Sequence, residues 1–126
     1  MNDLDELAAI RSVVNDYLEG MVYGDADQLR KAMHEKCMQA GHMPQGLEFI
    51  PRDEFIMEIL KEAPASPDTP IAHDVSLIDI TGDIAIVKVT DACFGTVWTD
   101  YLTLMKHDGR WIIIMKAFYD HGSSGK

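Results

Sequence analysis

The sequence predicts a single α+β domain in which three helices pack on a mostly antiparallel sheet. Three observations lead to this prediction: helical spacing of apolar residues in the first third of the chain, a further helix opening at Pro51, and four strand-like segments after residue 71. The length of 126 residues suits one domain with its own core. We assign residues 1–121 to this domain and residues 122–126 to a flexible tail.

Charge and cysteine content exclude several classes of protein. The chain has 11 Lys and Arg against 21 Asp and Glu, a formal charge of −10, which argues against nucleic acid as a partner. No apolar run approaches the roughly 20 residues that a membrane span needs, so we expect no membrane partner. Cys37 and Cys93 make no disulfide framework, and the acidic N-terminus lacks the features of a signal peptide. We therefore expect a cytoplasmic protein.

The first third of the chain is predicted to form two helices. The first runs from about Leu4 to Tyr23, and its apolar residues fall on one arc at 100° per residue. Gly24 is expected to end it, since glycine adopts the left-handed cap without strain. Asp25, with Gln28 three residues later, is expected to open a second, short helix ending near His34.

The middle of the chain is predicted to form a hairpin, or irregular strands, and then a helix. Residues 37–50 contain Gly41, Pro44 and Gly46, which favour turns over helix. Pro51 fits the first turn of a third helix that has one apolar face. The proline-rich segment from Pro64 to Pro70 is expected to be a mobile loop.

The last third is predicted to be a four-stranded antiparallel meander, with strands near 72–80, 84–94, 97–107 and 110–120. Turns at 82–83, 95–96 and 108–109 would join them; Asp108-Gly109 is the strongest hairpin signal. Because side chains alternate along a strand, this register gives an apolar inner face for the helices to cover. Its residues are Ile78, Ile80, Val87, Val89, Trp98, Leu102, Leu104, Trp111, Ile113, Met115 and Tyr119.

The opposite face of the meander is also predicted to be rich in apolar residues. A sheet with helices on one side normally turns polar residues to water on the other. We therefore expect a twofold homodimer across this face, although the chain's own segments could cover it instead. The residues expected at the dimer face are Ile86, Tyr101, Ile112, Ile114 and Phe118.

Three acidic residues fall in one row of the predicted inner face. The register sets Asp74 opposite Asp91, and Asp91 opposite Asp100, near one end of the sheet. Like charges placed directly opposite are destabilising. The row would persist only if a proton is shared, a cation sits between the carboxylates, or water reaches them. We expect Asp91 and Asp100 to point toward the helices near the entrance of a pocket.

The order of these elements resembles the nuclear-transport-factor-2-like superfamily, also described as a cystatin-like α+β fold. Three stretches are similar to its putative lumazine-binding, SnoaL-like branch: Tyr23-Gly24-Asp25 through His34, Gly82 to Ala85, and Asp100 to Lys116. The resemblance implies a conical fold with a strongly curved sheet, a pocket between the sheet and the helices, and frequent dimers across the outer face. Fold alone does not imply an activity.

The leading functional prediction is a small-molecule-binding domain with an apolar pocket for a cyclic or aromatic ligand. A second is an isomerase or dehydratase in which pocket carboxylates act as acid and base. A third is a homodimeric association module without a ligand. The catalytic candidates are Asp91, Asp100, Tyr17 and His42. The predicted pocket contains Tyr17, Met21, His42, Val89, Asp91, Trp98, Asp100, Trp111, Met115 and Tyr119.

Structural alternatives stand beside these roles. The segment from Glu35 to Ala40 has no Asp where the resemblance would place an isomerase base, which disfavours that activity. Asp100 could be a structural carboxylate, and Tyr17 a core residue. The spacing of His34, Cys37 and His42 matches no common metal site, and the thiols read as inert, so we expect neither metal nor cofactor.

Overall fold

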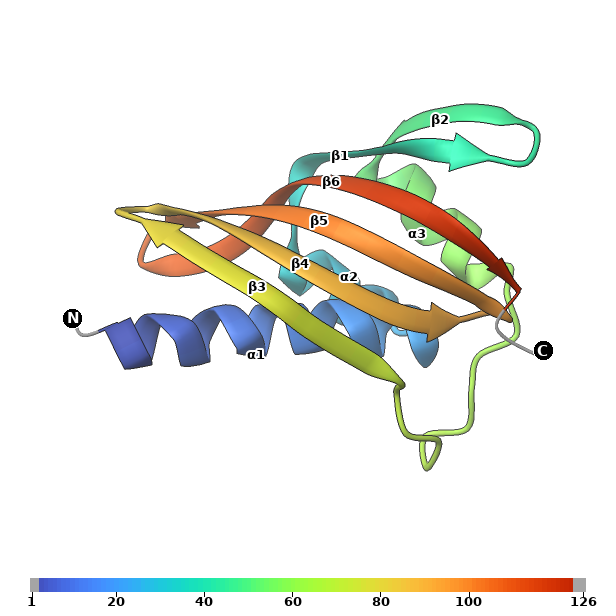
Figure 1. The fold of residues 1–126 in the computed structure, drawn as a ribbon, viewed down its shortest axis with the longest axis horizontal. Helices are drawn as coiled ribbons and strands as arrows, with labels where there is room; N and C mark the ends of the chain where they lie inside the picture. The colour runs from blue at the N-terminus through green and yellow to red at the C-terminus, as the bar shows by residue number, and fades with distance from the viewer. Residues whose placement is uncertain (1–2, 124–126) are drawn as a thin grey trace.

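The computed structural model describes residues 3–123, which form three helices against one six-stranded sheet (Figure 1). The strand order is β2-β1-β6-β5-β4-β3. Neighbouring strands are antiparallel except β1 and β6, which pair in parallel. Figure 1 shows α1 crossing beneath the meander and α3 beneath the end that carries the β1–β2 hairpin. The predicted fold class is confirmed.

The two N-terminal helices begin and end close to the predicted residues. Helix α1 spans Asp3–Val22, and Gly24 follows it with a φ of +68°. Helix α2 spans Ala26–Ala32, and the Asp25 side chain caps it by accepting a hydrogen bond from the Gln28 backbone N–H at 3.1 Å. The chain is already extended at Met33, so α2 ends two residues before His34.

The predicted hairpin and third helix are present. Strand β1 spans Met33–Met43, β2 spans Gly46–Pro51, and α3 spans Arg52–Leu60. Phe55, Ile56 and Ile59 on α3 are buried. The proline-rich segment lies in the connection that leads from α3 to the meander (Figure 1).

The meander consists of β3 (His73–Thr81), β4 (Ile84–Cys93), β5 (Thr96–His107) and β6 (Arg110–Ser123). The β4–β5 turn is Phe94-Gly95, both with positive φ, rather than the predicted Gly95-Thr96. Val87 therefore lies opposite Leu102, and Asp91 opposite Trp98. The pairing of β4 with β5 is shifted by two residues from the predicted register, so each side chain still points to the predicted face of the sheet. Strand β6 includes residues 122 and 123 of the predicted tail; residues 124–126 lie outside the described part of the chain.

A bulge in β6 changes which face its second half presents. Leu104 pairs with Ile113 as predicted, but Thr103 pairs with Met115, which leaves Ile114 as an extra residue. One extra residue inverts the alternation beyond it. Met115 and Tyr119 therefore point to the outer face instead of the inner one. Lys116 and Phe118, expected on the outer face, point inward.

A second bulge, at Ser76 in β3, separates Asp74 from the predicted acidic row. Val75 pairs with Val89 and Leu77 with Lys88, so Ser76 is unpaired. Asp74 then pairs with Thr90, whose side chain lies on the outer face, and Asp74 is exposed. The row predicted across three strands is therefore absent. Asp74 has left the inner face, and the predicted pairing of Asp91 with Asp100 is also wrong, since Asp91 lies opposite Trp98 and Asp100 opposite Val89.

The core fills the space between α1 and the inner face of the meander. Leu102, Leu104 and Ile113 are fully buried there, as predicted from the alternation. Gly20 allows α1 and α2 to pack closely, since a Cβ at this position would lie 2.6 Å from Cγ of Leu29. Within residues 3–123, no helix is both long and apolar enough to cross a membrane.

Candidate functional site

A cavity of about 530 Å³ lies at the end of the sheet where β4 turns into β5. The end of α1, helix α3, the β1–β2 hairpin and the inner faces of β4, β5 and β6 all contribute side chains to it. Its volume lies in the range of sites for small molecules. Much of its wall is apolar or aromatic, including Met21, Phe55, Ile59, Phe94, Trp98 and Phe118.

Two aromatic rings and a close approach of the backbone shape the β6 side of this cavity. Phe118 packs edge to face against Trp98, with ring centroids 5.7 Å apart. The indole N–H of Trp98 donates a hydrogen bond to the Cys93 carbonyl at 3.1 Å, which fixes the ring. Gly41 of β1 lies against Phe118, where a Cβ would come within 2.6 Å of the ring. The absence of a side chain at Gly41 therefore makes room for this wall.

Asp91 and Asp100 are both buried on the inner face and line the cavity, each with 2% of its surface exposed. The Tyr17 hydroxyl, on the buried side of α1, donates a hydrogen bond to Oδ2 of Asp100 at 2.7 Å. Neither carboxyl oxygen of Asp91 has a hydrogen-bond partner among the described residues. Such a group is unusual because an unpaired buried carboxyl is costly. The expectation that both carboxyls point toward the helices is confirmed.

Burial determines the protonation of these groups. Desolvation, with the nearby Asp100 charge, raises the pKa of Asp91 to about 7, although Lys116 lowers it in part. Desolvation and the same two carboxylates raise the pKa of Tyr17 well above its usual value. Tyr17 is therefore a neutral donor at physiological pH, while Asp91 can accept or release a proton near neutrality.

Lys116 is a buried cation in the wall of the cavity. Its side chain comes from β6, and only 6% of the residue is exposed. Nζ lies 4.2 Å from the ring centroid of Phe55 and 5.0 Å from that of Tyr17, which are favourable cation–π positions. No ion pair joins it to a carboxylate within residues 3–123. The ammonium group therefore keeps donors that can serve a ligand.

The remaining polar lining is mostly acidic. Nε2 of Gln39 donates to Oε2 of Glu48 at 2.8 Å, while Oε1 of Gln39 is buried without a partner among the described residues. Desolvation, a hydrogen bond with Glu48 and the charge of Glu48 raise the pKa of Glu58 to about 7. Glu62 and Asp120 also line the cavity, with Lys61 as the second cation. Carboxyl groups thus outnumber cations in this cavity.

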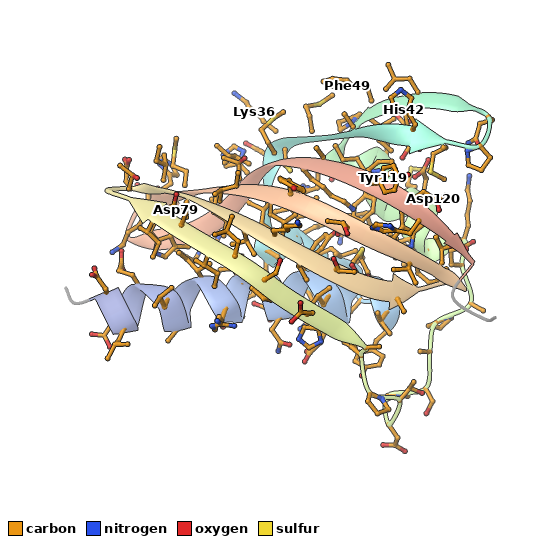
Figure 2. The ribbon with its side chains drawn as sticks, viewed as in Figure 1. Lys36, His42, Phe49, Asp79, Tyr119 and Asp120 are labelled. Atoms are coloured by element: carbon orange, nitrogen blue, oxygen red, sulfur yellow. The ribbon has the colours of Figure 1, made fainter. Side chains whose placement is uncertain are left out.

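The structure brings together four of the predicted pocket residues: Met21, Asp91, Trp98 and Asp100 line the cavity. Tyr17 is fully buried, and reaches the site through its hydrogen bond to Asp100. The other five positions lie elsewhere. Val89 and Trp111 are in the closed core, while Met115 and Tyr119, 43% and 65% exposed, are turned outward by the β6 bulge. His42 is also exposed, on the side of the hairpin away from the helices (Figure 2).

Sequence reasoning missed Gln39, Lys116 and Phe118 as lining residues. A regular register for β6 places Lys116 and Phe118 on the outer face, and only the bulge reverses them. The alternation did contain a hint of this bulge. A regular strand puts Lys116 on the same face as the apolar residues Ile112, Ile114 and Phe118. Gln39 lies in β1, whose pairing with β6 is parallel and shifts register between Met33 and Met38. No short-range pattern predicts that pairing.

The two thiols, Cys37 and Cys93, are both free and buried. Among residues 3–123, no three His, Cys, Asp or Glu side chains gather closely enough to hold an ion. Burial raises the pKa of Cys37 to about 11 and that of Cys93 to about 12. Both thiols are therefore protonated at neutral pH, which agrees with the prediction that they are inert.

The outer face of the sheet carries many exposed apolar side chains. Ile86 and Tyr101 from the predicted dimer face are 36% and 45% exposed, while Ile112 is 8% exposed beside a shallow groove that Ile114 also lines. Phe118 does not belong to this face because the bulge turns it into the cavity. The larger exposed apolar residues of this face are Leu47, Phe49, Leu77, Ile84, Ile86, Tyr101, Met115 and Tyr119.

Solved structures share this fold over nearly the whole chain. In solved structures, the chain is similar to a nuclear-transport-factor-2-like protein of unknown function from Silicibacter pomeroyi, with 28% identity, a TM-score of 0.90, and 96% and 100% of the two chains covered. A protein from Shewanella baltica with the same description has 25% identity, a TM-score of 0.88, and 98% and 99% coverage. The fold class is therefore nuclear-transport-factor-2-like.

The model of the putative lumazine-binding family matches residues 5–119, and the chain belongs to that family. A ketosteroid isomerase-like protein from Erwinia carotovora atroseptica shares the fold, with 15% identity, a TM-score of 0.70, and 97% and 99% of the chains covered. None of the curated proteins matches the sequence. The family and its structural neighbours suggest a ligand-binding domain.

Proposed function

We propose that the protein binds a small cyclic or aromatic molecule in the cavity beneath the β4–β5 turn. The observation that carries this proposal is an open volume of about 530 Å³ with aromatic walls, lined by buried polar groups that have no partner within the described residues. A module serving association alone has no need for such a space. The proposal includes a cytoplasmic location, with which two buried free thiols are compatible.

A thermal-shift screen of pterins, flavins and cyclic ketones tests this function. A ligand at a hundred times its Kd adds about 2.7 kcal/mol to the stability. Trp98→Ala removes a cavity wall and should reduce the shift, whereas Tyr119→Ala, an aromatic change on the outer face, should leave it intact. If no compound in the panel shifts the unfolding of the wild-type protein, or if both variants lose the shift equally, the proposed cavity function is wrong.

An isomerase or dehydratase remains the second candidate because of one observation. Asp91 is a buried carboxyl with a pKa of about 7 and no hydrogen-bond partner among the described residues, which suits a group that moves protons. Incubation of a cyclic enone with the protein in D₂O tests it by NMR. Catalysed exchange of the α-protons that Asp91→Asn abolishes would support this activity; exchange at the rate of buffer alone would exclude it for that substrate.

We also propose a twofold homodimer across the outer face of the sheet. This proposal is supported by the exposed apolar side chains on β3, β4, β5 and β6, which lie on one face of the sheet. A monomer surface usually carries such residues singly. Native mass spectrometry of the purified protein should give twice the chain mass. Ile86→Lys, in the middle of this face, should give the single-chain mass without loss of helical circular dichroism. A wild-type protein that is monomeric at micromolar concentration would refute the dimer.

A further inference from the structure

The two carboxyl oxygens of Asp91 have no hydrogen-bond donor near them among the described residues. Both Oδ atoms are closed off from solvent and have no hydrogen-bond partner among residues 3–123, although Asp91 lines the cavity. Its neighbour Asp100 differs, because the Tyr17 hydroxyl already occupies one of its oxygens. A ligand that donates to Asp91 would therefore recover hydrogen bonds that the empty protein lacks.

The two oxygens of one carboxyl match a pair of parallel donors. An exocyclic amino group beside a ring N–H supplies this pair, as in pterin; beside a bare ring nitrogen, as in a 2-aminopyrimidine, it supplies one donor and one acceptor. If Asp91 is ionised, it accepts from the amino N–H and from a ring N–H. If Asp91 is protonated, it donates its O–H to the bare ring nitrogen and accepts from the amino group. The same bidentate geometry therefore serves both protonation states.

The rest of the cavity favours the same kind of molecule. Trp98 and Phe118 offer aromatic surface for a flat ring. The excess of carboxyl groups in the lining opposes an anionic ligand, which excludes free phosphate and carboxylic acids as the preferred class. The Lys116 ammonium can donate to a ring carbonyl or nitrogen. A cyclic ketone would satisfy Lys116 but leave Asp91 unpaired.

We propose that Asp91 recognises the amino-substituted edge of a nitrogen heteroaromatic ligand, with a ring nitrogen and its adjacent –NH₂ group bonded to the two carboxyl oxygens. This inference rests on the proposed ligand-binding cavity and specifies its ligand. It also separates two pteridines. When Asp91 is ionised, both of its oxygens can only accept. Pterin then presents a ring N–H beside its 2-amino group, whereas each ring N–H of lumazine lies beside a carbonyl that would face the second Asp91 oxygen.

Isothermal titration calorimetry with pterin and lumazine on the wild-type protein is the direct test, at a pH above the Asp91 pKa of about 7 so that the carboxyl is ionised. We expect pterin to bind about tenfold more tightly or better, because lumazine leaves an acceptor facing an acceptor in a buried site. Asp91→Asn should bring the two affinities together. Asp79→Asn, an exposed acidic residue on the outer face (Figure 2), is the matched control, and should keep the wild-type ratio.

The outcomes separate this inference from the proposed function. Equal binding of the two pteridines, or tighter binding of lumazine, overturns the role of Asp91 while leaving a ligand cavity in place. A preference for pterin that Asp91→Asn does not change overturns it as well. If the folded wild-type protein binds none of the pteridines, flavins and cyclic ketones tested, the inference and the proposed function both fail. Equal binding by the wild-type protein overturns the role of Asp91 without any variant.

Discussion

The two ends of the inner face differ, although α1 and the same strands contribute to both. At the closed end, Val87, Leu104 and Trp111 are almost entirely buried and pack into a mostly apolar core, in which the Trp111 indole N–H is buried without a hydrogen-bond partner among the described residues. At the open end, the same strands carry Asp91, Asp100 and other polar residues around a cavity. The closed end gains stability from packing, whereas the open end retains buried polar groups that cost stability. Residues retained at such a cost indicate where a binding function lies.

The largest expected effect comes from truncating a tryptophan at each end. Trp111→Ala should lower the free energy of unfolding by about 3–5 kcal/mol, because it empties a large volume in the closed core. Trp98→Ala should cost less, about 1–2 kcal/mol, since Trp98 already borders open space. Urea denaturation of both variants measures the difference. Equal losses would mean that the two ends are packed alike.

The buried carboxyl should give the open end a pH dependence of stability. Asp91 has a pKa of about 7 in the folded protein, against 3.8 for an ordinary Asp. Its protonated form fits the fold, so stability is full below about pH 4 and declines as pH rises toward 7. The groups around it are Asp100, Tyr17, Lys116, Cys93 and, across the β3 pairing, His73.

Asp91→Asn removes this titration without changing the shape of the side chain. Its stability should exceed that of the wild-type protein by an amount that grows between pH 4 and 7, to at most about 4 kcal/mol. Urea denaturation of both proteins at each pH unit measures this gap. The subtraction cancels contributions from other groups, including Glu58. Stability curves that stay parallel from pH 4 to 8 would contradict the assignment.

A third prediction concerns the wall of the open end. Gly41→Ala should cost about 2–3 kcal/mol, because its Cβ would come within 2.6 Å of the Phe118 ring and force the ring into the cavity. Phe118→Leu should relieve most of this loss in the double variant, a coupling that a double-mutant cycle measures. Additive losses would show that Gly41 and Phe118 do not meet.

The closed end could be predicted from the sequence more fully than the open end. Val87, Leu102 and Leu104 follow from simple alternation along β4 and β5, and the two-residue turns do not disturb that alternation. The open end depends on one extra residue, Ile114, which the sequence does not mark with a glycine or proline. It also depends on parallel pairing between β1 and β6, which are about 80 residues apart in the chain.

The same distinction explains which site residues were predictable. Asp91 and Asp100 lie before the β6 bulge in the chain order, and alternation alone placed them inward. Lys116 and Phe118 lie after it, and alternation placed them outward. Tyr17 was predicted as either a core or a pocket residue, and it combines the two: its ring is buried and its hydroxyl reaches Asp100. Local periodicity predicts which residues are buried in the core. The β6 bulge and the parallel pairing of β1 with β6 determine which residues line the cavity.

The smallest predicted effect isolates that hydrogen bond at the boundary between the two ends. Tyr17→Phe keeps the ring in place but leaves Oδ2 of Asp100 buried without its donor, which should cost about 1–2 kcal/mol in urea denaturation. Tyr23→Phe is the matched control, because its hydroxyl donates to the Thr69 carbonyl at an exposed position. Water can replace that donor, so the control should cost less than about 0.5 kcal/mol. Equal losses in the two variants would mean that Asp100 gains nothing from burial beside Tyr17, and that the polar groups of the open end are hydrated.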